Sequence, residues 1–375
     1  MRRHVWLIFG AILLVSCGQE APVAPASSQP AASAGAAGSA QKSWDDVVAA
    51  AKQEKKVVVS GPANPLWRNL ITGLSKDYPD IQIEYTGGDS RDFWPRIEQE
   101  RKGGQFLWDV RIGGPDPQVF AALQQGVLEP VGPLLILPEV TDESKWLGGW
   151  QQFYADKAGK YLPGFLADVS RPIYVNRDTL PEPQIQSEQD LLKADYKGKI
   201  LLQDPRGGAG LGFLTTFLKI DGEPFVRQLL SQNLVISGDN RQIAEWIVRS
   251  RQPIAIGLRN YDLLVFQQQG QGSNVKPVDG VKALPLSIGS GGIQMLTKAP
   301  HPKATQVLIN WLLTAKTQKE LAQAVQQNSR RLDVPPGAAD EVVDPKRLDQ
   351  YVAHQTEDLL PLREQALKIA AEMLK

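Results

Sequence analysis

Hydrophobic and polar positions follow two alternating periods along the chain from residue 43 onward. Apolar residues recur at helical spacing over 43–55, 64–80 and 91–104. Short apolar runs that indicate buried strands lie between them, at 56–62, 81–89 and 106–116. Asp116-Pro117 then opens a further helix, which Gly126 closes. Helices that alternate with strands over short connections predict an α/β fold with a doubly wound, largely parallel sheet.

The same alternation returns after an irregular stretch over about residues 127–168. Strands are expected at 171–180, 197–205 and 254–258, and an extended segment at 283–300. Helices are expected after the glycine loop at 207–212, over 238–253, from Pro302, from a capping box at Thr317–Glu320, and over the tail 345–373. The chain therefore contains a second α/β unit.

The first residues have the pattern of a bacterial lipoprotein leader. Arg2 and Arg3 precede the apolar run Val5–Val15, which is too short to cross a bilayer but suits a secretory signal. The run leads into Ser16-Cys17, which resembles the motif where bacteria cleave before the cysteine and attach lipid to its thiol. We expect a signal peptide over 1–16 and lipidation of Cys17. Since Cys17 is the only cysteine, an intrachain disulfide is excluded.

Composition separates a tether from a folded body. Residues 18–42 are almost entirely Ala, Ser, Pro, Gly and Gln, which together with Cys17 predicts a disordered tether over 17–42. The remaining roughly 330 residues are enough for two lobes. Basic and acidic residues balance, 41 against 41, so the chain has no basic surplus for nucleic acid. The lipid is the expected contact with a membrane.

Five segments together resemble the type 2 periplasmic solute-binding proteins of bacterial ABC importers, in particular the ferric-iron-binding-protein-like branch, which also includes binders of thiamine, phosphonates and sugar phosphates. They are "SWDDVVAAAKQEKKVVVSG", "WDVRIGGPDPQVFAALQQGVLEP", "RPIYVNRDTL", "QDPRGGAGLGF" and "IGSGGIQMLTKAPHPKATQVLINWLLTAKTQKELAQ". The resemblance covers about residues 43–330.

That resemblance implies two α/β lobes joined by crossover strands, which close by a hinge on a solute in the interlobe cleft. Lobe 1 would comprise 43–168 with 281–325, and lobe 2 would comprise 169–280 with 326–375. The implied partners are an ABC permease and its ATPase. We expect a monomer without a cofactor, held by its lipid at the extracytoplasmic face of a bacterial membrane.

Ligand contacts are expected where strands end and helices begin. The candidate ligand-binding residues at such positions are Asn64, Ser90, Arg91, Gly114, Arg171, Tyr174, Arg206, Gly207, Gly208, Arg259, Tyr261 and Ser290. Guanidinium groups suit carboxylates and phosphates, so this set predicts an anionic organic or phosphorylated solute, with Arg206 and Arg259 as the favoured pair. The competing interpretation is that each arginine forms an ordinary surface ion pair.

The glycine loop "QDPRGGAGLGF" is not a nucleotide-binding motif. It lacks the Lys-Ser/Thr of a P-loop, and Phe213 stands where the third glycine of a dinucleotide loop would be. Two interpretations remain: half of an anion clamp at a helix N-terminus, or tight packing of the helix on its strand.

Ferric iron is the alternative ligand. The iron branch uses two adjacent tyrosines after a strand like 254–258, whereas here the loop reads Arg259-Asn260-Tyr261-Asp262. If iron is bound, its ligands would include Tyr261, Asp262 and Asp89. Trp94, which follows a loop, is the aromatic candidate for stacking on a ligand.

Other functions are disfavoured by the inventory of reactive side chains. The three histidines lie at 4, 301 and 354, and the chain has neither a G-x-S-x-G nor an H-E-x-x-H motif. We therefore expect that the protein is not an enzyme. A hydrolase or a sensory lipoprotein without a transport role is the less favoured alternative.

Overall fold

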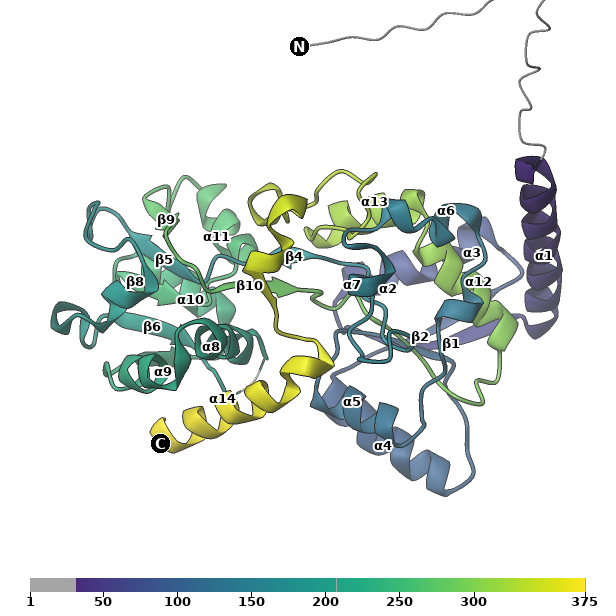
Figure 1. Cartoon of the computed structure of the whole chain (residues 1–375), viewed down its shortest axis with the longest axis horizontal. Coiled ribbons are helices and arrows are strands. Elements are labelled where there is room, and N and C mark those ends of the chain that lie inside the picture. Colours follow the sequence, from purple (N-terminus) through teal and green to yellow (C-terminus); the bar gives the residue numbers. More distant parts are fainter. Residues whose placement is uncertain (1–31, 207, 375) are drawn as a thin grey trace, which may run out of the picture.

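The computed structural model describes residues 32–206 and 208–374. The predicted leader, Cys17 and Gly207 lie outside these residues. The described chain forms two lobes that lie side by side, with a narrow sheet between them (Figure 1).

The sheet of lobe 1 has four strands in the order β11-β3-β1-β2. Its strands are β1 (Lys56–Gly61), β2 (Gln82–Gly87), β3 (Val110–Ile112) and β11 (Ile293–Met295). The first three are parallel, and β11 returns antiparallel beside β3. Successive side chains of β1 point to opposite faces of the sheet, and both faces are buried. Val57 and Val59 face one core, while Val58 faces the other.

Helices cover both faces of this sheet. One face carries α1 (Ala32–Glu54), α2 (Pro65–Thr72), α3 (Leu74–Asp77), α12 (Pro302–Leu312) and α13 (Ala315–Val325). The other face carries α4 (Ser90–Lys102) and α5 (Pro117–Gln124), which pack on each other. This two-sided burial explains the continuous apolar run of β1.

The irregular stretch between α5 and β4 (Asp168–Val169) forms a set of short helices on lobe 1. It contains η1 (Gly132–Leu134), α6 (Pro138–Thr141), η2 (Glu143–Lys145) and α7 (Gly149–Phe153). Trp146 anchors it, because its buried ring packs on Phe153 and its indole Nε1 donates to the Val140 carbonyl at 2.9 Å.

A three-stranded sheet joins the lobes. It consists of β4 (Asp168–Val169), β10 (Leu284–Ser287) and β12 (Tyr351–Ala353), in the order β12-β10-β4. Figure 1 shows β4 and β10 running between the two lobes, with the yellow C-terminal segment crossing the same junction. We call this the hinge sheet.

Lobe 2 repeats the layered plan of lobe 1 with a five-stranded sheet. Its strands are β5 (Ile173–Asn176), β6 (Ile200–Gln203), β7 (Val235–Ser237), β8 (Ile254–Ile256) and β9 (Val275–Pro277), in the order β7-β6-β8-β5-β9. The strands β7, β6 and β8 are parallel, whereas β5 is antiparallel to both of its neighbours, β8 and β9.

The helices of lobe 2 again divide between two faces. On one face lie α8 (Gly208–Ile220), α9 (Gly222–Leu230) and α14 (Leu360–Met373), with the turns η3 (Glu188–Leu192) and η4 (Ala194–Tyr196). On the other lie α10 (Asn240–Val248) and α11 (Asn260–Gln267). The turns η5 (Ala339–Glu341), η6 (Pro345–Gln350) and η7 (Glu357–Leu359) belong to the C-terminal segment.

The C-terminal segment touches both lobes. Near its start, Arg330 exchanges backbone hydrogen bonds with Phe165 and Leu147 of lobe 1. After β12, the Glu357 amide donates to the Ala155 carbonyl, and a Glu357 carboxylate oxygen accepts from the Lys157 amide at 2.8 Å. The final helix α14 then packs on α8 and α9 of lobe 2.

Several predicted element boundaries are wrong. The segment predicted as a disordered tether is helical from Ala32 onward, because its alanine-rich stretch favours the helix that follows it. Asp89, rather than Ser90, caps α4, and Thr314 caps α13 ahead of the predicted capping box. The tail is not one helix over 345–373, since pairing of β12 with β10 overrides the helical pattern. The predicted long helix of 64–80 divides at Gly73.

Candidate functional site

Loops at the carboxyl ends of the parallel strands form two rims, one on each lobe. The lobe 1 rim comprises residues 61–64, 87–91 and 113–116, after β1, β2 and β3. The lobe 2 rim comprises 204–206, 208–209, 237–240 and 257–262, after β6, β7 and β8. Gly114 of the first rim packs against the Gly289 carbonyl beside the hinge sheet, where a Cβ atom would have no room. The lobe 1 rim therefore adjoins the junction of the lobes.

Arg111 holds the lobe 1 rim together. Its side chain is only 5% exposed, and its guanidinium donates from Nη1 to Ser60 Oγ at 2.6 Å and from Nη2 to the Gly88 carbonyl at 3.3 Å. The guanidinium also lies over the Phe93 ring, 4.9 Å from its centroid. One side chain of β3 thus connects the ends of β1 and β2. Sequence analysis missed it, because an arginine inside an apolar strand carries no motif.

Two Asp-x-Arg pairs with the same bonding pattern stand at the helix starts of the two rims. In lobe 1, Arg91 donates to Asp89 from its amide at 2.9 Å and from Nε and Nη2 at 3.3 Å each. In lobe 2, Arg206 donates to Asp204 from its amide at 3.0 Å, from Nε at 2.9 Å and from Nη2 at 2.8 Å. These bonds lower the pKa of both carboxyl groups, so each pair is a fixed carboxylate and guanidinium.

The other two predicted arginines also have carboxylate partners. Arg259 precedes α11 and donates from Nε to Asp262 Oδ2 at 2.6 Å. Arg171 lies 3.8 Å from the Asp279 carboxylate. Local ion pairing, the competing interpretation, therefore describes all four arginines. Such a pair uses only part of the guanidinium, which leaves other N–H groups to a ligand.

The remaining predicted residues are divided between surface and core. Asn64 caps α2 by accepting from the Leu66 amide at 2.8 Å, and Ser290 is half-buried in the turn after β10. Ser90 Oγ is buried without a hydrogen-bond partner in the described part of the chain. Tyr174 is 3% exposed and belongs to the core of lobe 2, so its ring is a packing element, and burial raises the pKa of its hydroxyl group.

The glycine loop shows the tight packing of the helix that was one of its two predicted roles. A Cβ on Gly210 would collide with the Asp204 carbonyl, and one on Gly212 would lie 2.5 Å from His354 Nε2, so these two glycines serve close packing. Gly208 opens α8 with a φ of +56°, and a Cβ there would meet nothing within 4 Å. The start of α8 therefore has open space beside Arg206.

An acidic group adjoins the lobe 2 rim and was not predicted. Asp168 of β4 is buried and accepts from the Asn328 amide at 2.7 Å, and burial raises the pKa of its carboxyl group. Burial likewise raises the pKa of Glu341 to about 7, with Asp340 adding to the shift and Arg259 opposing it. Arg259, which pairs with Asp262, therefore also lies near enough to Glu341 to oppose the shift.

The predicted iron ligands are divided between the two rims. Asp89 lies on the lobe 1 rim, whereas Tyr261 and Asp262 lie on the lobe 2 rim, and Tyr261 is 54% exposed. No group of three or more His, Cys, Asp or Glu residues is placed to hold a metal ion within residues 32–206 and 208–374. Both predicted aspartates already accept hydrogen bonds from arginine.

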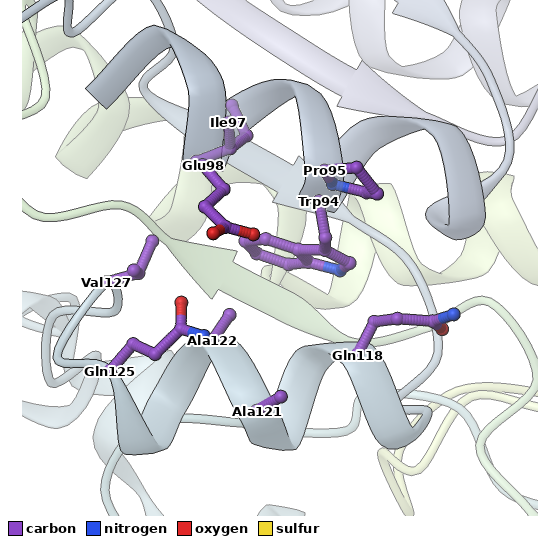
Figure 2. Close-up of a pocket in the computed structure, with 9 residues that line it drawn as sticks. All are labelled: Trp94, Pro95, Ile97, Glu98, Gln118, Ala121, Ala122, Gln125 and Val127. Carbon is purple, nitrogen blue, oxygen red and sulfur yellow. The ribbon is translucent and has the colours of Figure 1, made fainter. Parts of the chain in front are cut away.

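Trp94 lies away from the rims, which corrects its expected role in ligand stacking. It is buried between α4 and α5, where it lines a cavity of about 130 Å³ on lobe 1 (Figure 2). Figure 2 shows the indole between the two helices, with Glu98 above it and Gln118 beside it. A second cavity, of about 470 Å³, is also on lobe 1, between Pro133 and Lys298. Neither cavity includes a rim residue.

Comparison with known proteins agrees with this architecture. The family model of bacterial extracellular solute-binding proteins matches residues 60–319. No curated protein sequence matches the chain. Within the described residues, no helix is long and apolar enough to cross a membrane.

Solved structures with the same fold are binding proteins of low sequence identity. Iron-bound HitA from Pseudomonas aeruginosa is 16% identical, with a TM-score of 0.62 over 85% of this chain and 99% of its own. Apo ferric ion-binding protein A from Pasteurella haemolytica is 19% identical, with a TM-score of 0.65 over 85% and 98%. IdiA from Trichodesmium, in complex with iron and citrate, is 15% identical, with a TM-score of 0.64 over 85% and 99%. These likenesses confirm the predicted two-lobe periplasmic binding protein type 2 fold.

Proposed function

This chain belongs to the family of bacterial extracellular solute-binding proteins, and we propose that it captures a small anionic solute between its two lobes and delivers it to an ABC permease. The solute carries carboxylate or phosphate groups. Capture requires binding and closure about the hinge sheet, without bond-making. The permease works with its ATPase, and the lipid on Cys17 keeps the binding protein at the membrane.

The observation that carries this proposal is the matched pair of Asp-x-Arg motifs on opposite rims. Each aspartate orients its arginine through Nε and Nη2, so a ligand oxygen can approach the other edge of the guanidinium. Preorganised arginines lose little freedom on binding, which favours affinity for an anion. Arg259 and the open start of α8 add further donors on lobe 2.

Ferric iron, alone or with a bound anion, is the second candidate. The specific observation in its favour is that the solved structures named above are iron-binding proteins, one of them with citrate. On this ground alone, iron is favoured over an organic anion. The residues of this chain favour the anion, because the rims carry one exposed tyrosine, Tyr261, and aspartates that are already paired with arginine. An iron–citrate complex would satisfy both observations.

A thermal-shift panel separates the two candidates. A ligand that binds only the folded protein raises its melting temperature with concentration. The panel contains organic phosphates, di- and tricarboxylates, ferric chloride with a weak chelator, and ferric citrate. Anion capture predicts a shift with an iron-free organic anion. A strong shift with ferric salts, and none with iron-free anions, would replace the first candidate by the second.

A further inference from the structure

Arg363 is a buried arginine at the junction of the lobes, and among the described residues it has no ion-pair partner. It lies in the first turn of α14 and is 8% exposed. Its Nε and Nη1 groups are buried and have no hydrogen-bond partner in the described part of the chain. Its neighbour Leu360 packs against the α4–α5 core of lobe 1, whereas Leu362 packs against the core of lobe 2.

The surroundings of Arg363 include one carboxylate and one imidazole. Asp116 lies on the lobe 1 rim, and its charge opposes the effect of burial, which lowers the pKa of Arg363. Its carboxylate already caps α5 by accepting from the Val119 amide at 3.0 Å. His354 contacts α8 at Gly212, and burial together with the charge of Arg363 lowers its pKa to about 3, so the imidazole is neutral.

A buried guanidinium with two unused donors is costly unless an acceptor reaches it. The desolvation of a charged group is recovered only through a paired charge and hydrogen bonds. Asp116 is near, but it forms no ion pair with Arg363 among the described residues. Two donors of Arg363 are therefore left for an acceptor that the described residues do not supply.

We propose that Arg363 binds an anionic group, a carboxylate or a phosphate, at the junction of the lobes, between the Asp116 loop and α14. This deepens the proposed function, on which it rests for the identity of the solute, because it assigns one anionic group of that solute to the C-terminal helix. A solute bound there contacts lobe 1 through the Asp116 loop and lobe 2 through α14. Arg363 thus couples capture to the relative position of the lobes.

The test is isothermal calorimetry of the full chain with inorganic phosphate and with citrate as separate probes. Arg363→Gln removes the charge, and Arg363→Lys restores a charge without the planar donor set. Asp116→Asn keeps a helix cap and removes the nearby carboxylate. Arg249→Gln is the matched control, because Arg249 is an exposed arginine of lobe 2 that pairs with Glu245 within its own helix. The probe that binds identifies phosphate or carboxylate as the preferred group.

The proposal predicts a roughly tenfold or greater loss of affinity in Arg363→Gln and a partial recovery of affinity in Arg363→Lys. Arg249→Gln should bind as the natural protein does. Asp116→Asn should strengthen binding, since a competing carboxylate is gone. Equal affinity in Arg363→Gln and the natural protein overturns the proposal, as does weaker binding in Asp116→Asn, which would make Asp116 the partner. Failure of the natural protein to bind either probe also overturns it.

The fate of the proposed function is read separately, from Arg206→Gln measured with the same probes. If Arg206→Gln binds normally while Arg363→Gln does not, the site at Arg363 stands without the anion clamp on the rims. If only Arg206→Gln loses binding, the clamp stands and the site at Arg363 does not.

Discussion

Arg206 donates two hydrogen bonds to the carboxylate of Asp204, from Nε to Oδ1 at 2.9 Å and from Nη2 to Oδ2 at 2.8 Å. The pair fixes a guanidinium at the start of α8, on the rim of lobe 2. Arg259 stands at the start of α11 on the same rim. These two arginines are the residues on which anion capture depends most in our account.

Substitution of either arginine should weaken binding of the solute. We expect Arg206→Ala and Arg259→Ala each to cost roughly 1.5–3 kcal/mol of binding free energy, the value of a hydrogen bond to a charged group. Calorimetry with the anion that gives the largest thermal shift measures this loss. Arg249→Ala is the control and should bind normally. Unchanged affinity in both rim variants would remove the anion model.

Arg111 should matter for folding stability more than the exposed arginines. Arg111→Met leaves Ser60 Oγ and the Gly88 carbonyl without their donor, and we expect a loss of about 2–4 kcal/mol in the free energy of unfolding. Urea denaturation followed by tryptophan fluorescence measures it. Arg96→Met is the comparison: Arg96 is an exposed partner of Glu100, and its loss should cost under about 1 kcal/mol. Equal costs in the two variants would contradict the role of Arg111.

Glu341 should make stability fall as pH rises. Its pKa is about 7 in the folded protein, against 4.5 without burial, so the folded state keeps the proton between these values while the unfolded state releases it. The stabilisation is complete below pH 4.5 and lost as pH rises through 7. The free energy of unfolding of Glu341→Gln should therefore exceed that of the natural protein by up to roughly 3 kcal/mol at pH 8.5, and by far less at pH 5. If the difference in free energy of unfolding between the two proteins does not change with pH, the raised pKa of Glu341 is refuted.

Lipidation of Cys17 should decide where the protein is found. Cys17→Ala should release it from the membrane fraction, because the leader's cysteine is the only thiol that can carry lipid. Solute affinity should stay unchanged, since Cys17 precedes the folded lobes. Fractionation followed by immunoblotting reports the location. Persistence of the variant at the membrane would mean that Cys17 is not the anchor.

Local signals predicted the elements that local chemistry determines. The cap Asp116 begins α5 as expected, because an aspartate before a helix satisfies its first amides. The strand β1 was readable from its valines, since both faces of the sheet are covered. Resemblance to the type 2 solute-binding proteins supplied the arrangement of two lobes.

Contacts between distant segments were beyond prediction. Nothing in the sequence joins Arg111 to Ser60, which are 51 residues apart, or His354 to Gly212. Arg363 appeared as one charge of an amphipathic helix, and only the packing of Leu360 and Leu362 on different lobes shows its position. The rim arginines were found, whereas of their aspartate partners only Asp89 and Asp262 were singled out, as ligands for the alternative of bound iron.

Native mass spectrometry of the protein as purified tests the central claim most directly. Anion capture predicts a bound species with the mass of a carboxylated or phosphorylated organic compound, and loss of that species from an Arg206→Ala, Arg259→Ala double variant. The account would be contradicted by a bound mass of iron alone, or by an organic mass that the double variant retains.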